Sequence, residues 1–403
     1  MDAITLADIE AAAQRVKQAV HWTELDYSTT ISGLAGCDVY LKQENLQRTG
    51  SFKIRGAYNK LALLSKAEKA RGVIAASAGN HAQGVALAAQ LAGIPATIVM
   101  PHGAPIAKSS ATQGYGAKVI LAGQSYDEAY QKAVELQEET GLTYIHAFDD
   151  VGTVAGQGTI GLEIMQDLSD VEAIVVPIGG GGLIAGIAVA AKTINPQVKI
   201  YGVQASGAPA AYHGFHRMVM PDKAFTGSIA DGIAVKCPGQ LTMGIINQLV
   251  DDVVLVDDEE IAQAILLLLE RTKVVAEGSG AVGIAALLQN KLPVHGQKTA
   301  VVVSGGNIDV QMLSIIIERG LAKSGRRVRL HSVLVDRPGN LQKFLGTIAG
   351  TQANVISVNQ DRIRPNVPLA QAEVEVLLET KDEEHIQQLV STLTFAGYPV
   401  KVI

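Results

Sequence analysis

A lysine stands in an unusual setting early in the chain. Lys53 lies between Phe52 and Ile54, and glycines stand three residues before and three residues after it. A lysine flanked by apolar residues can be semi-buried, and burial lowers the pKa of an amine toward the range that suits Schiff-base chemistry. A surface lysine at the start of a helix would give the same pattern, since lysine is usually exposed. Lys53 is therefore a candidate nucleophile, with an ordinary surface lysine left open.

A second polar segment directly follows the apolar run 73–76 and opens a predicted helix. It consists of Ser77, Ala78, Gly79, Asn80 and His81. Backbone N–H groups converge on an anion where a strand turns into a helix, and Ser77 and Asn80 add side-chain donors. The segment could therefore bind a carboxylate, although Ser77 or Asn80 could also be an ordinary helix cap. A single histidine beside a cap, here His81, is more often positional than a catalytic base.

A run of glycines separates another apolar run from the next helical pattern. The run consists of Gly179, Gly180, Gly181 and Gly182, and Leu183 follows it. Backbone N–H groups without side chains at a helix start suit a phosphate. The segment has neither the Gly-Lys-Ser/Thr of a Walker loop nor the G-x-G-x-x-G spacing with a downstream acidic residue. It favours a phosphate monoester over a dinucleotide, with a flexible turn as the alternative.

Ser304 stands at the end of the last long apolar run, 300–303. The carboxyl end of a parallel strand faces the ligand crevice of an open α/β sheet, so Ser304 could hydrogen-bond a ring nitrogen there. A capping serine would look the same.

The elements that must position these residues are visible as apolar runs alternating with helical patterns. Strands are predicted at 73–76, 96–100, 119–121, 143–145, 173–176, 200–203, 253–256 and 300–303. Helices are predicted at about 81–91, up to 108, and at about 125–139. Runs that are apolar on both faces and spaced by helices indicate parallel sheets covered on both sides. We therefore predict an α/β fold with two open α/β layers.

The C-terminal part has a different pattern. A linker is predicted at Lys323 to Arg327, before strands at 328–335, 355–358, 372–378 and 399–403 and helices at 340–349 and 383–393. The resulting order βαββαβ is typical of the ferredoxin-like arrangement.

Composition narrows the function classes. The 403 residues include 33 Lys+Arg and 39 Asp+Glu, a formal net charge of −6, which argues against a nucleic-acid surface over the whole chain. No apolar run reaches the ~18–20 residues of a membrane span, and no secretory signal is visible, so we expect a cytoplasmic protein without a membrane partner. Cys37 and Cys237 cannot form a disulfide framework or a cysteine-based zinc site.

The four segments together resemble the fold-type-II pyridoxal 5'-phosphate (PLP) enzymes, and most closely the threonine dehydratase (threonine ammonia-lyase) family. The resemblance runs from Thr23 through Asn307. It implies a tryptophan-synthase-β-like fold in which Lys53 carries PLP as a Schiff base and Phe52 flanks the ring. It also implies that Asn80 hydrogen-bonds the phenolic oxygen and that Ser304 faces the pyridine nitrogen.

The resemblance assigns further residues. Gly179 to Gly182, with Leu183, would bind the phosphate, and the turn from Ser77 to His81 would hold the substrate carboxylate. Glu277 would lie near the cofactor, with a surface glutamate as the alternative. We expect a catalytic domain at 1–325, with a large subdomain at about 1–47 and 153–325 and a small one at about 48–152.

Residues 326–403 resemble an ACT regulatory domain. The strand-to-helix turn that carries this resemblance contains Pro338, Gly339 and Asn340. The resemblance implies an amino-acid effector at this turn, with a role only in assembly as the alternative. We expect a homodimer or a homotetramer, because closed symmetric assemblies are the commonest.

The implied activity is an α,β-elimination that converts L-threonine to 2-oxobutanoate and ammonia, and L-serine to pyruvate. Ala78 stands where serine racemases of the family carry a second serine, which favours elimination over racemisation. Gln204 and Ala210 replace groups of a racemase-like divalent-metal site, so no metal is expected. A β-replacement enzyme such as a cysteine synthase, and a non-catalytic amino-acid sensor, stay open as alternatives.

Overall fold

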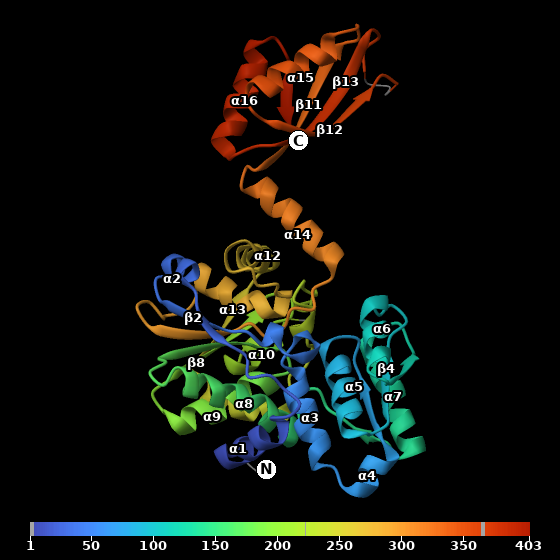
Figure 1. The fold of residues 1–403 in the computed structure, drawn as a ribbon, viewed down its shortest axis with the longest axis vertical. Helices are drawn as coiled ribbons and strands as arrows, with labels where there is room; N and C mark the ends of the chain where they lie inside the picture. The colour runs from blue at the N-terminus through green and yellow to red at the C-terminus, as the bar shows by residue number, and fades with distance from the viewer. Residues whose placement is uncertain (1–3, 222, 364–366) are drawn as a thin grey trace. The chain divides into compact units, whose positions relative to one another are not determined.

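The computed structural model describes residues 4–221, 223–363 and 367–403. The chain folds into two compact units, one ending at Asp309 and one running from Val310 to Ile403 (Figure 1). Helix α14 (Val310–Lys323) belongs to the second unit, which thus starts before residue 326. The predicted linker coincides with the turn after α14, where Gly325 has a φ of 66°. The functional division at residue 326 stays a prediction.

The first unit contains a six-stranded sheet, in which every neighbouring pair is parallel except β1 and β2. In spatial order its strands are β1 (Leu25–Tyr27), β2 (Asp38–Lys42), β10 (Lys298–Val302), β7 (Ala173–Pro177), β8 (Lys199–Ala205) and β9 (Asp252–Val256). The last four strands predicted in this part of the chain, 173–176, 200–203, 253–256 and 300–303, correspond to β7 to β10. Strands β1 and β2 were not predicted. Strand β2 mixes charged residues with apolar ones and therefore contains no continuous apolar run.

Helices cover both faces of this sheet. Ile174 and Val176 of β7 share a core cluster with Ile184 of helix α9 (Gly182–Ile194). Val175, between them, lies against Gly283 of helix α13 (Gly278–Leu288). Since successive strand residues point to opposite faces, α9 and α13 pack on opposite sides. The other elements around this sheet are α1 (Leu6–Val16), α2 (Thr29–Ala35), η1 (Glu44–Leu46), η2 (Arg48–Gly50), α8 (Val151–Asp167), α10 (Ala210–Phe215), η3 (Asp231–Ile233), α11 (Gln240–Leu249), α12 (Asp258–Leu267) and η4 (Leu268–Thr272).

A second, fully parallel sheet forms the other layer of the first unit. Its spatial order is β5 (Lys118–Leu121), β4 (Ala96–Met100), β3 (Val73–Ala76) and β6 (Thr143–Tyr144). Its helices are α3 (Lys53–Leu63), α4 (Lys66–Arg71), α5 (Asn80–Ala92), α6 (Ile106–Gly114) and α7 (Tyr126–Thr140). Helix α6 begins after Pro105, which stands at its N-cap, and continues to Gly114, beyond the expected end at Lys108. Helix α3 packs against both α5 and α8.

The second unit confirms the order βαββαβ. Its elements after α14 are β11 (Arg327–Val335), α15 (Asn340–Gly350), β12 (Asn354–Asp361), β13 (Gln371–Glu379), α16 (Glu383–Phe395) and β14 (Val400–Val402). The strands form an antiparallel sheet in the order β12-β13-β11-β14. Alternate residues of β11 and β13 are buried, which is the pattern of a sheet covered on one face. Pro338 and Gly339 lie in the turn before α15, and Gly339 has a φ of 88°.

These observations confirm the predicted class: two open α/β layers followed by a ferredoxin-like unit. Among the residues the structure describes, no helix is long and apolar enough to cross a membrane.

Candidate active site

Lys53 is the first residue of α3, and the backbone before it is tied to the end of β10. Ser51 forms an isolated antiparallel bridge with Gly305, and the Phe52 N–H donates to the Ser304 carbonyl at 3.2 Å. The partly buried Lys53 amine donates to the Ala147 carbonyl at 3.1 Å. Burial lowers the pKa of Lys53 to about 8, although Glu277 opposes that decrease. An amine with this pKa has a larger neutral fraction near neutral pH than an ordinary lysine, which favours its use as a nucleophile or base.

Asn80 and Glu277 meet through their side chains. Asn80 Nδ2 donates to Glu277 Oε1 at 2.7 Å, and Ser279 Oγ donates to the same oxygen at 2.7 Å. Asn307 Nδ2 in turn donates to Asn80 Oδ1 at 2.8 Å. Burial raises the pKa of Glu277, although the hydrogen bond from Ser279 opposes the increase. Glu277 is therefore a buried group that orients Asn80, and the surface alternative is wrong.

Sequence reasoning did not assign Ser279 and Asn307. Both lie within segments that it singled out for other residues, Ser279 two positions after Glu277 and Asn307 three positions after Ser304. The signal available for them was the presence of polar side chains beside glycines at an element boundary.

The glycine loop joins β7 to α9. Gly181 precedes α9 with a φ of 94°, which a residue with a side chain rarely adopts. A Cβ on Gly180 would overlap the ring of Phe148, so this loop fits only without side chains. Within the described residues no side chain caps the first N–H groups of α9, which suits them to an anion. Leu183 is buried in the core beneath the loop.

The turn before α5 contains the remaining predicted residues. The Gly79 N–H donates to Ser77 Oγ at 3.2 Å, and the helix begins at Asn80. His81 is buried, and its Nε2 lies 2.9 Å from the Ile145 carbonyl. Burial lowers the pKa of His81 to about 3, so the neutral ring donates this hydrogen bond. His81 fixes the turn to the layer built on the second, fully parallel sheet, and Ala78 packs partly against the same layer.

Ser304 is buried, and its hydroxyl lies within hydrogen-bond distance of the Ser279 carbonyl, at 3.3 Å. The bonds already described connect Ser304 with Phe52, and Ser279 with Glu277 and Asn80. The structure therefore joins the segments of the lysine, the asparagine, the glutamate and the serine through direct contacts. Pro338, Gly339 and Asn340 belong to the second unit.

This donor set fits an aldehyde that carries a phosphate. The lysine supplies an amine, the asparagine an amide, and the helix start behind the glycine loop supplies uncapped N–H groups. The fully buried Ser51 hydroxyl makes no hydrogen bond to the described residues, which leaves a further polar group for a ligand beside Lys53.

Comparison with known proteins agrees with that chemistry. The family model of pyridoxal-phosphate-dependent enzymes matches residues 16–306, and the chain belongs to this family. It is 54% identical to an L-threonine ammonia-lyase of Thermotoga maritima over 400 residues, covering 99% of this chain and 100% of the relative.

Two solved structures extend the likeness to the fold. The processed form of threonine deaminase isoform 2 from Solanum lycopersicum has a TM-score of 0.74 at 41% identity, covering 78% of this chain and 91% of that one. Maize serine racemase has a TM-score of 0.74 at 37% identity, covering 80% of this chain and 99% of that one. The chain is a PLP-dependent enzyme of fold type II.

Proposed function

We propose that this protein is an L-threonine ammonia-lyase that converts L-threonine to 2-oxobutanoate and ammonia, and L-serine to pyruvate. The observation that carries the proposal is the Lys53 amine, whose pKa is lowered to about 8. The segment of Lys53 contacts the serine segment through the bond from Phe52 to Ser304, and it contacts the asparagine segment through Asn307, which donates to both Thr49 and Asn80. The likeness to proteins named threonine ammonia-lyase and threonine deaminase supports the choice of substrate.

Bound PLP would supply the electron sink that stabilises negative charge at the substrate α-carbon. Lys53 would hold the cofactor through its amine, and the same amine, when free and neutral, would take the α-proton of the substrate. The uncapped N–H groups behind Gly179 to Gly182 would hold the phosphate. Asn80, oriented by Glu277 and Asn307, would donate to the ring oxygen.

The remaining residues favour elimination. Ser304 is a neutral hydroxyl, and beside the ring nitrogen of a bound cofactor it would favour the unprotonated ring, which suits β-elimination better than transamination. The turn from Ser77 to Asn80 holds the substrate carboxylate through backbone and side-chain donors. Ala78 has no proton to give to the opposite face of the substrate, which disfavours racemisation.

Regulation and assembly are part of the proposal. The second unit senses an amino acid at the turn of Pro338, Gly339 and Asn340. A cytoplasmic homodimer or homotetramer is the expected form, since sensing units of this kind usually pair.

The test measures 2-oxo-acid formation from L-threonine and L-serine, with and without isoleucine and valine. The variants are Lys53→Ala and, as a matched control on the same helix, Lys60→Ala, whose amine pairs with Asp150 at 2.6 Å at the far end of α3. We expect turnover in the parent and in Lys60→Ala and none in Lys53→Ala, which stays folded by circular dichroism. Ammonia release retained in Lys53→Ala would contradict the mechanism.

The same assay separates the alternatives. D-serine formed from L-serine would indicate a racemase, and a parent that holds PLP without forming oxo acid would indicate a β-replacement enzyme. A response to a branched amino acid would support sensing by the second unit, and its absence would leave that unit to assembly or to another effector.

A further inference from the structure

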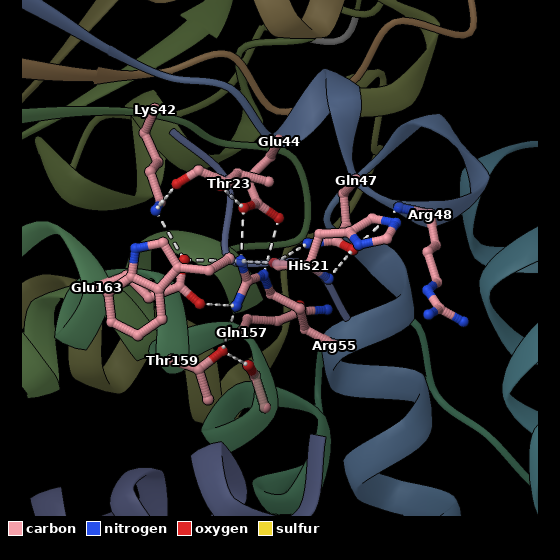
Figure 2. Close-up of polar contacts among 12 residues, drawn as sticks. His21, Thr23, Lys42, Glu44, Gln47, Arg48, Arg55, Gln157, Thr159 and Glu163 are labelled. Carbon is pink, nitrogen blue, oxygen red and sulfur yellow. Dashed lines mark hydrogen bonds and ion pairs between the residues drawn. The ribbon is translucent and has the colours of Figure 1, made fainter. Parts of the chain in front are cut away.

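Behind the first turn of α3 lies a cluster of buried charges that the proposed mechanism does not use. Figure 2 shows its centre, the Arg55 guanidinium, between two carboxylates. Three of the four charged residues, Arg55, Glu44 and Lys42, are completely buried, and the fourth, Glu163, is 5% exposed. Taking four charges out of water is costly unless each is paired and hydrogen-bonded. A cluster of this kind therefore calls for a specific role.

Arg55 is bound bidentately on both sides. Its Nε and Nη2 donate to Glu44 at 2.8 and 2.7 Å, and its Nη1 and Nη2 donate to Glu163 at 2.5 and 2.9 Å. Two neutral acceptors complete the set, Thr159 Oγ1 at 3.1 Å and the His21 carbonyl at 3.3 Å. Although burial opposes ionisation of Glu44, Arg55 holds the pKa of its carboxyl below the usual value. A planar fork held in this way leaves the Arg55 side chain one orientation.

The start of α3 lacks the devices that usually fix a helix start. Phe52 precedes the helix and forms no side-chain cap, and the described first turn contains no acidic residue. Instead, Lys53 and Arg55 place positive charges at the N-terminus of the helix, where the helix dipole is also positive and therefore repels them. The chain also enters through Thr49 and Gly50 with φ of 64° and 70°. The described contacts of this turn include the ion pairs of Arg55 with the buried carboxylates of Glu44 and Glu163.

The cluster also connects α3 to the segments that carry the other site residues. Asn45 follows Glu44, and its N–H donates to the Val303 carbonyl at 2.9 Å, directly before Ser304. Its Nδ2 donates to the Val275 carbonyl at 3.1 Å, two residues before Glu277. On the other side, Glu163 belongs to α8, against which α3 packs so closely that a Cβ on Gly156 would lie 2.6 Å from the Arg55 carbonyl.

We propose that Arg55 is a positioning residue for Lys53. The Phe52–Ser304 bond holds the backbone just before Lys53, and the bidentate contacts of Arg55 hold the helical turn just after it. The residues of one helical turn are linked by hydrogen bonds and move together. Fixing the backbone on both sides of Lys53 therefore also restricts the position of its amine. The inference rests on the proposed role of Lys53 as the residue that carries PLP.

Three holoenzyme variants test it. Arg55→Lys keeps the charge but loses the bidentate geometry, and Glu44→Gln weakens one side while leaving the pairing with Glu163. Lys60→Met is the control, because it removes an ion pair between the same two helices far from the first turn. Borohydride reduction followed by peptide mass analysis gives the fraction of Lys53 that carries PLP. The kcat and KM for L-threonine and the melting temperature are measured in parallel.

We expect the PLP-carrying fraction of Lys53 to fall by about half or more in Arg55→Lys, and kcat by about ten-fold with KM within about three-fold. Glu44→Gln should show a smaller change in the same direction, and Lys60→Met none. Parental labelling and kcat in Arg55→Lys and Glu44→Gln, or equal losses in Lys60→Met, would overturn the inference. Should Arg55→Lys fail to fold, Glu44→Gln decides in the same way.

The labelling also separates this inference from the proposed function. A parent that carries PLP on Lys53 but forms no 2-oxo acid would sink the substrate assignment, while the labelled fractions still decide the role of Arg55. A parent without PLP on Lys53 would overturn both.

Discussion

Asn80 donates from Nδ2 to Glu277 Oε1 at 2.7 Å, although 197 positions separate the two residues in the chain. Asn80 is the first residue of α5, in the layer of the four-stranded parallel sheet, and Glu277 directly precedes α13, in the layer of the six-stranded sheet. The bond therefore joins the two α/β layers beside Lys53, and it makes the orientation of Asn80 depend on a carboxyl group from the other layer.

Replacing Glu277 should change how the site responds to pH. Glu277 raises the pKa of Lys53, so Glu277→Gln should lower it further while the amide oxygen still accepts from Asn80 and Ser279. Lys53 can act as a base only once substrate is bound, and kcat reports groups in that complex. A base with a lower pKa stays neutral at lower pH, so the acidic limb of the kcat profile should move to lower pH. The measurement is kcat for L-threonine at saturating substrate between pH 6 and 10. An unmoved limb would mean that Glu277 is already protonated in the working enzyme.

A side chain on the glycine loop should damage cofactor binding. The Cβ of Gly180→Ala would overlap the Phe148 ring, and overpacking of this kind costs about 1–3 kcal/mol of stability. We expect a lower melting temperature and loss of PLP on gel filtration, because the loop must move away from the start of α9. Gly244→Ala in α11 is the matched control, since its Cβ meets nothing within 4 Å. Full PLP retention in Gly180→Ala would argue against a phosphate at this loop.

His81 should contribute to acid sensitivity. Burial lowers its pKa to about 3 in the folded state, whereas an unfolded histidine titrates near pH 6.5. Above pH 6.5 both states are neutral at this site. As the pH is lowered from 6.5 toward 3, the unfolded state binds a proton at this histidine and the folded state does not. The free energy of unfolding therefore decreases by up to about 1.4 kcal/mol for each pH unit of acidification.

The variant His81→Gln can still donate to the Ile145 carbonyl but does not titrate. Its melting temperature should therefore fall less steeply than that of the parent over the same pH range. Parallel curves for the two proteins would show that His81 is protonated in the folded state or does not limit stability.

The sequence alone was sufficient for most of the fold. Val73–Ala76, Ala96–Met100 and the βαββαβ order of the second unit were readable because burial on both faces, or alternation on one, leaves a local pattern of apolar residues. Strand β2 left no such pattern. Its last residue, Lys42, is completely buried because Glu163 of α8 pairs with it at 2.7 Å, and a partner so far along the chain is invisible locally.

The same distinction holds for the site. The sequence by itself predicted Lys53, Asn80, the glycine loop and Ser304 as site residues, since a lysine among apolar residues and glycines at strand ends have a chemical meaning wherever they occur. Only the tertiary structure decided that Glu277 and Asn307 orient Asn80, that His81 is a neutral anchor, and that Arg55 is held by two carboxylates. These roles depend on which distant side chains share a buried volume. Burial and pairing, which set pKa values and orientations, are properties of the packed chain.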